Sequence, residues 1–266
     1  MRTIAVANFK GGTGKTATCH ALGVALVNHH RRHVLLVDCD PQGGLTGACG
    51  VRDASGGALA HVFDQSFRSA AELGRFVYGL IHEVQPGLEL VPADIALARS
   101  EQLLMSRKDR EYVLRSALGT VSSRYDVAVL DCAPNLGLLT TNALAAADAV
   151  LIPTMPNILD LRALKLFLDG VRDFKRWLNP RLEILGILVT FFDGRTTHHN
   201  RIVHAMQGLG LPVLDVMIGR SVRVAEASNE SKSIVDYEPW HKQAEAYREL
   251  GAIVDRWISK SPQMRR

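Results

Sequence analysis

Two lysines stand close together in the glycine-rich stretch "KGGTGKT", residues 10–16, near the start of the chain. In such a loop successive backbone N–H groups can point at phosphate oxygens, and a helix that begins there adds its partial positive charge. Lys15 is spaced to reach the β- and γ-phosphates of a nucleotide, and the Thr16 hydroxyl is spaced to bind Mg²⁺. The strict phosphate-loop pattern needs a glycine where this chain has Phe9, and it gives no role to Lys10.

Acidic residues end two further apolar runs. "HVLLVDCDPQG" carries Asp38 and Asp40, and "DVAVLDCAP" carries Asp131. Carboxylates that leave buried strands beside a phosphate site can hold Mg²⁺ through water or orient the water that attacks the phosphate. We therefore take Thr16, Asp40 and Asp131 as the candidate metal site. A purely structural role of Asp38 or Asp40 in the turn after the strand is an alternative.

Short apolar runs alternate with longer helical patterns along the whole chain. Runs of Val, Ile and Leu that lack polar alternation are typical of strands buried on both faces, and therefore of a parallel sheet. The alternation predicts right-handed crossovers with helices on both faces, and each motif above then falls at the carboxyl edge, where such sheets bind ligands. Strands are predicted at residues 3–8, 33–38, 88–93, 126–131, 149–154, 185–192 and 212–218.

No Pro/Gly/Ser-rich linker or internal repeat divides the 266 residues, so we predict one doubly wound α/β domain over 1–266. The stretch 53–87 is the least regular, and we expect it to be helical and peripheral. The four cysteines form no C-x-x-C pair, which argues against a metal centre and a disulfide framework. No apolar run is long enough for a membrane span, and the chain begins directly with a strand, so we expect a cytoplasmic protein. The net charge of +4 is a mild sign of an anionic partner.

The phosphate-loop stretch resembles the deviant Walker A motif of the ParA/MinD family of ATPases. This resemblance implies a P-loop NTPase that uses ATP and Mg²⁺, in which Lys10 reaches across a nucleotide-sandwich dimer to the partner's phosphates, as an arginine finger does. The segments around Asp40 and Asp131 resemble the family's hydrolysis and Walker B signatures, although Ala133 replaces a proline common there. The implied catalytic residues are Lys10, Lys15 and Asp40. The implied phosphate-loop ligands are Lys10, Gly11, Gly12, Thr13, Gly14, Lys15, Thr16 and Ala17.

Later blocks are similar to the DNA-partitioning branch of that family, the ParA/Soj proteins. These blocks are "TFFDGRTTHHNRIV", "IGRSVRVAEAS" and "DYEPWHKQAEAYREL". The resemblance implies that Arg195 and Arg223 bind DNA without sequence preference, with Arg220 extending the patch. It also places Gly219 and Ser221 near the base, where relatives have a proline and an asparagine.

The function implied is a slow DNA-partitioning ATPase. ATP would assemble a homodimer, the homodimer would bind DNA and associate with the nucleoid, and hydrolysis stimulated by a ParB-like centromere-binding protein would release it. Two alternatives remain: a MinD-like ATPase that acts on a membrane surface, and a ParA-like ATPase that positions a protein cargo. Against the membrane alternative, we expect the last helix to pack on the sheet, and the polar tail "SKSPQMRR" is too short for a further amphipathic helix.

Overall fold

The computed structural model of the chain describes residues 1–52 and 57–260. Residues 53–56, at the start of the stretch predicted to be irregular, and 261–266, within the predicted polar tail, lie outside the described residues. Within the described part, one sheet has the strand order β3-β4-β2-β5-β1-β6-β7-β8. The strands are β1 Arg2–Val6, β2 Val34–Cys39, β3 His82–Gln85, β4 Leu88–Val91, β5 Val127–Cys132, β6 Ala149–Thr154, β7 Glu183–Phe192 and β8 Val213–Gly219.

The predicted fold class is confirmed. Every neighbouring pair of strands from β4 to β8 is parallel, and the central strands β2, β5 and β6 are buried along their whole length. The edge strand β3 pairs antiparallel with β4 and was not predicted. The expectation that 53–87 is helical is therefore wrong at its end, because the short, mostly polar sequence "HEVQ" of β3 carries no strand pattern and becomes a strand by pairing with β4.

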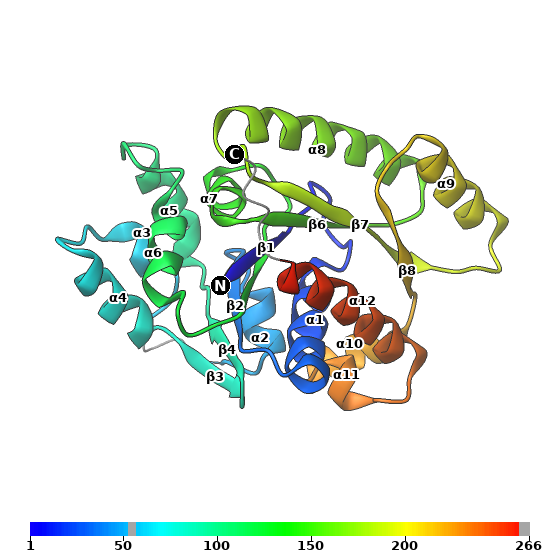
Figure 1. Cartoon of the computed structure of the whole chain (residues 1–266), viewed down its shortest axis with the longest axis horizontal. Helices are drawn as coiled ribbons and strands as arrows, with labels where there is room; N and C mark the ends of the chain where they lie inside the picture. Colours follow the sequence, from blue (N-terminus) through cyan, green and yellow to red (C-terminus); the bar gives the residue numbers. More distant parts are fainter. Residues whose placement is uncertain (53–56, 261–266) are drawn as a thin grey trace.

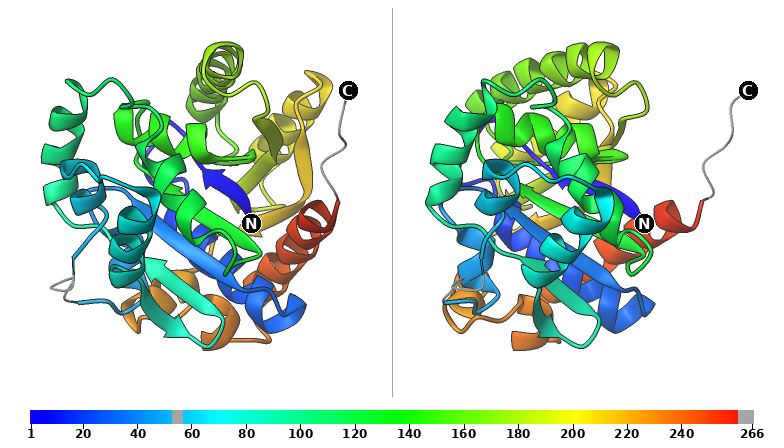
Figure 2. Two further views of the ribbon diagram at one scale, coloured as in Figure 1. Left: turned by 60° about the vertical axis from the view of Figure 1, so that its left-hand side comes forward. Right: turned by 90° about the vertical axis from the view of Figure 1, so that its left-hand side faces the viewer.

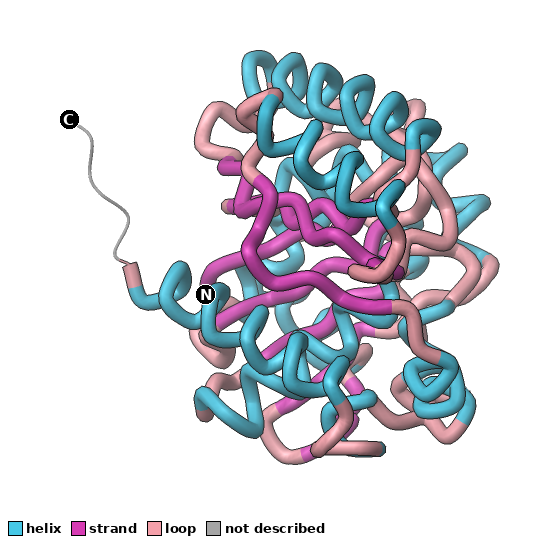
Figure 3. Tube along the Cα trace, turned by 90° about the vertical axis from the view of Figure 1, so that its right-hand side faces the viewer, coloured by secondary structure: helices cyan, strands magenta, loops and turns pink. Residues whose placement is uncertain are grey.

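Helices cover both faces of the sheet (Figures 1 and 2). One apolar core joins the sheet to α3 to α9, and a second joins the opposite face to α1, α2, α10, α11 and α12. Figure 3 shows the strands as a layer between these two sets. The helices are α1 Lys15–His30, α2 Gly44–Ala48, α3 Ala60–Asp64, α4 Ala70–Gly79, α5 Ala96–Leu104, α6 Val113–Val121, α7 Leu138–Ala146, α8 Ile158–Trp177, α9 Thr197–Gly208, α10 Val222–Asn229, α11 Ile234–Tyr237 and α12 Lys242–Ser259.

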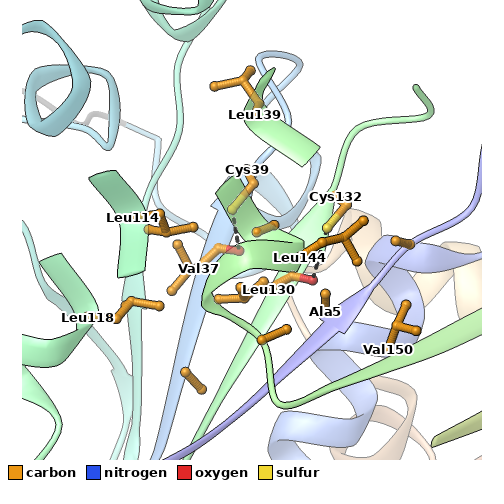
Figure 4. Packing of buried hydrophobic residues seen from close by; sticks show 14 of the residues in the cluster. Ala5, Val37, Cys39, Leu114, Leu118, Leu130, Cys132, Leu139, Leu144 and Val150 are labelled. Carbon is orange, nitrogen blue, oxygen red and sulfur yellow. Dashed lines mark hydrogen bonds between the residues drawn. The ribbon is translucent and has the colours of Figure 1, made fainter. Parts of the chain in front are cut away.

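Strand register brings the predicted acids together at one edge of the sheet. Asp38 on β2 lies beside Asp131 on β5, and Cys39 lies beside Cys132 one position further on. Both thiols point into the first core, near Leu139 and Leu144 (Figure 4). Burial raises the pKa of each thiol, so both stay protonated and act as small apolar groups.

The last helix was predicted to pack on the sheet; it packs mainly on the phosphate-loop helix α1 and also contacts the sheet at β8. Tyr247, Leu250 and Val254 of α12 are buried against α1, where a Cβ atom at Gly251 would lie 3.2 Å from the Ala25 side chain. Across residues 1–52 and 57–260, no helix is long and apolar enough to cross a membrane. The apolar face of α12 is therefore used in the core.

Candidate nucleotide-binding site

The glycine-rich loop lies between β1 and α1, at the carboxyl edge of the sheet. Gly12 and Gly14 have φ values of 73° and 83°, a left-handed conformation that glycine adopts without strain. Gly14 is the N-cap residue of α1 and offers no capping side chain, so the first N–H groups of this helix remain open to a ligand. The Thr13 carbonyl accepts a hydrogen bond of 2.9 Å from the Thr190 hydroxyl of β7, which fixes the loop to the sheet.

The two lysines of the loop point to different places. Lys15 is buried, and its Nζ donates to the backbone carbonyl of Lys10 at 3.1 Å, so it curls over its own loop. The Lys10 side chain is 37% exposed and leaves the loop toward α8, where its Nζ lies 2.5 Å from Oδ1 of Asp160. Asn157, the N-cap residue of α8, accepts a hydrogen bond from the Asp160 backbone N–H and donates one from Nδ2 to the Asp160 carboxylate. These two bonds hold Asp160 in position.

Thr16 and Asp131 meet at the start of α1. The Thr16 hydroxyl donates to Oδ2 of Asp131 at 2.7 Å. Oδ1 of Asp131 is buried and has no hydrogen-bond partner among the described residues. Burial, and then the charge of Asp38, raise the pKa of Asp131 to about 8. The hydrogen bond from Thr16 and the positive charge of Lys15 act in the opposite direction and lower this pKa. A buried carboxylate oxygen without a partner, next to a hydroxyl, fits a hard cation such as Mg²⁺, which prefers oxygen ligands.

Asp38 and Asp40 have different environments. Oδ2 of the buried Asp38 accepts the backbone N–H and the hydroxyl of Thr46 at 2.9 and 2.7 Å, so its role is to fix the loop after β2. Asp40 is partly exposed, and its Oδ1 accepts the Gln42 N–H at 3.0 Å. No hydrogen bond between described residues uses the second oxygen of Asp40, and the charge of Asp40 raises the pKa of Asp131.

Two hollows continue from the phosphate loop along the ends of β7 and β8. The first, of about 520 Å³, reaches from Gly12 to Asp193 and Arg220. The second, of about 680 Å³, shares Asp193 and Arg220 and extends to Gly219 and Gln243. Each has the size of a site for a small organic ligand. We call the second hollow the base groove, because it is lined by Gly219, which the resemblance places near the base.

The structure separates the two residues predicted near the base. Gly219 lines the base groove, whereas the Ser221 hydroxyl accepts the Arg223 N–H at 3.2 Å and caps α10. Ser221 is therefore occupied in holding the helix. Gln243, Phe192 and Asp160 were not singled out from the sequence, because a lone polar or aromatic residue on a helix or strand has no spacing pattern that marks it.

Two of the three predicted DNA-binding arginines, Arg195 and Arg220, line the base groove. The Arg195 side chain is 92% exposed and pairs with Asp193 at 3.0 Å. Arg220 is exposed and lines both hollows. Arg223 pairs with Glu226 at 2.5 Å and with Glu238, and it lies over the Tyr237 ring. Two carboxylates thus compensate the charge of Arg223, so Arg195 and Arg220 are the stronger candidates for a phosphate contact.

Comparison with known proteins gives the family. A family profile described as an AAA domain matches residues 1–184. The chain is 36% identical to the chromosome partitioning protein ParA of Myxococcus xanthus over 99% of its own length and 92% of that protein. It is also 36% identical to the sporulation initiation inhibitor protein Soj of Bacillus subtilis, over 95% of this chain and 98% of that one.

A solved structure shows the same fold with a nucleotide. Cobyrinic acid a,c-diamide synthase from Mycobacterium smegmatis, with bound ATP analogue and magnesium, is 35% identical and superimposes with a TM-score of 0.81, covering 97% of this chain and 96% of that one. The chain belongs to the ParA/MinD superfamily of P-loop ATPases. Relatives named ParA and Soj are among the proteins that align with nearly the whole chain.

Proposed function

We propose that this protein is a ParA/Soj-like partitioning ATPase, which uses ATP and Mg²⁺ to form a homodimer that binds DNA without sequence preference. Hydrolysis, stimulated by a ParB-like centromere-binding protein, then releases the dimer from DNA. The protein would be cytoplasmic and associated with the nucleoid. ParA and Soj relatives that align over nearly the whole chain support this proposal.

The observation that carries the proposal is the divergence of the two loop lysines. Lys15 lies over its own loop, whereas the Lys10 side chain leaves that loop, stays 37% exposed and pairs with the buried Asp160 of α8. A nucleotide bound by one subunit needs only Lys15. A second lysine that projects away from that site is suited to a nucleotide held by a facing subunit. ATP would then contact both subunits and stabilise the dimer.

Each candidate residue has a distinct task in phosphoryl transfer to water. The open N–H groups at the start of α1 and the Lys15 ammonium would hold the β- and γ-phosphates. Lys10 of the facing subunit would neutralise the charge that develops on the transferring group. Thr16 and the free oxygen of Asp131 would bind Mg²⁺, which supplies further charge neutralisation when it is bound. Asp40 would orient the attacking water through its available oxygen.

Binding to a nonspecific DNA duplex without nucleotide, with ADP and with ATP–Mg²⁺, at two salt concentrations, tests the proposal. We expect binding only with ATP–Mg²⁺, and affinity should fall steeply with salt because each phosphate contact releases counterions. Arg195→Glu should weaken binding by about tenfold or more and reduce the salt dependence. Arg172→Glu is the matched control, because Arg172 is also an exposed arginine paired with an aspartate, but on α8.

The other outcomes separate the alternatives. An ATP-dependent dimer that binds no DNA in any state would refute the DNA step and favour a protein cargo. Sedimentation of that dimer with anionic vesicles would instead favour a MinD-like role. Binding that is equally strong in all nucleotide states would refute the switch itself.

A further inference from the structure

Gln243 holds its carboxamide at the wall of the base groove. It lies in the first turn of α12 and is 2% exposed, and its Oε1 accepts the Gly219 backbone N–H at 2.7 Å. A backbone N–H can bond only to the oxygen of a carboxamide, so this contact sets the orientation of the amide and leaves Nε2 as the free end. No hydrogen bond between described residues uses Nε2. A buried amide with two unused donors lines a groove of ligand size.

Gly219 is fitted to this carboxamide. A Cβ atom at position 219 would lie 2.7 Å from Nε2 of Gln243 and 3.3 Å from the Phe192 carbonyl oxygen. The φ angle of Gly219 is outside the left-handed region, so its backbone conformation does not itself require glycine. A proline there would both remove the N–H that holds Oε1 and fill the space of the amide. Gly219 and Gln243 thus form one unit at the end of β8.

The unit lies where a nucleobase would be bound. The base groove shares Asp193 and Arg220 with the hollow that reaches Gly12 of the phosphate loop, so the two hollows are neighbours. Phe192 and Met217 give the groove apolar walls, which suit a flat aromatic ring. Adenine offers ring nitrogens N1, N3 and N7 as acceptors, and an amide donor is the complementary group.

We propose that Gln243 is a base-contacting residue, whose Nε2 donates a hydrogen bond to one ring nitrogen of adenine and whose position depends on Gly219. The inference rests on the proposed function as an ATP-binding protein and deepens it. It gives the groove a preference for bases that present an acceptor to Nε2. The resemblance to relatives with a proline at position 219 does not supply this contact.

Calorimetry with ATP, 1-deaza-ATP, 3-deaza-ATP and 7-deaza-ATP tests the contact on the full chain. In the wild type, one deaza analogue should bind about threefold to tenfold more weakly than ATP, the range expected for one neutral hydrogen bond. Gln243→Met should bind ATP as weakly as the wild type binds that analogue. The affinity of the analogue itself should be the same for this variant and the wild type. Gly219→Ala, which displaces the amide while keeping the glutamine, should behave in the same way.

Tripolyphosphate is the control probe, because it tests the phosphate loop without a base. Its affinity should be the same in the wild type and both variants. The contact would be refuted if every deaza analogue bound the wild type as tightly as ATP. It would also be refuted if the variants still bound the deaza analogue more weakly than ATP by the same factor as the wild type. Neither result would contradict ATP binding itself. If the wild type bound neither ATP nor tripolyphosphate, the proposed function would fail and this inference with it.

Discussion

Lys10→Ala should affect stability and dimerisation through two separable causes. The Asp160 side chain is 0% exposed, and its Oδ1 has no hydrogen-bond partner among the described residues other than the ion pair with Lys10 at 2.5 Å. Removing the ammonium leaves a buried carboxylate oxygen without compensation. A fully buried pair loses about 3–5 kcal/mol in this way. Because the Lys10 side chain is 37% exposed, its truncation also admits water to Asp160, and we expect a smaller loss of about 2 kcal/mol in the free energy of unfolding.

Thermal unfolding without nucleotide measures this loss. About 2 kcal/mol corresponds to a decrease in Tm of roughly 4–8 °C for a domain of this size. Asp160→Asn removes the charge that Lys10 compensates, so the double variant Lys10→Ala/Asp160→Asn should recover most of the lost stability. Light scattering with ATP–Mg²⁺ should still show a monomer for the double variant, because Lys10 is missing. An unchanged Tm in Lys10→Ala, or a double variant no more stable than the single one, would refute the reasoning.

Three further predictions concern the phosphate site and the core. Lys15→Ala should weaken ATP binding by about 10- to 100-fold in calorimetry, since charge-assisted hydrogen bonds to phosphate are lost; unchanged affinity would contradict its role. Asp131→Asn should abolish most of the gain in ATP affinity on adding Mg²⁺, while apo stability is kept, because burial and the charge of Asp38 raise the pKa of this carboxyl and already disfavour its charged form. Burial lowers the pKa of His20 to about 4, below its unfolded value of about 6.5, so the unfolded chain takes up the proton first. Stability should therefore fall as the pH drops from about 6.5 toward 4, by up to about 3 kcal/mol, and denaturant unfolding of His20→Asn should lack this part of the decrease.

The sheet and the phosphate loop could be predicted because their signals are local. Continuous apolar runs mark strands buried on both faces, and a run of glycines ending in Lys15-Thr16 has few other uses. The edge strand β3 could not be predicted, since its four residues include His82 and Glu83 and depend on β4 for their conformation. The sequence also left open what Asp38 does; its two hydrogen bonds to Thr46 exist only once the loop after β2 has folded back.

Contacts between distant residues account for the rest of the site. Asp160 is 150 positions along the chain from Lys10 and has no motif of its own, yet it receives the ammonium that the resemblance assigned to a partner subunit. The pairing of Arg223 with Glu226 follows a helical spacing, but its contact with Glu238 needs α11 in place. The resemblance made Arg195 and Arg223 equal candidates, and only the folded arrangement, in which two carboxylates pair with Arg223, separates them.

The packing of α12 on α1 has a consequence for how the chain is made. Arg32, just past α1, bonds Asp255 of α12, a residue 223 positions later. Tyr247, Leu250 and Val254 cover the core face of the phosphate-loop helix. During synthesis, α12 therefore follows α1 by more than half of the chain. Until α12 has been made, the face of α1 that contacts it stays exposed. We expect chains that are stalled or truncated before α12 to require chaperones. A fusion after the last residue of α12 should preserve folding better than any deletion within that helix.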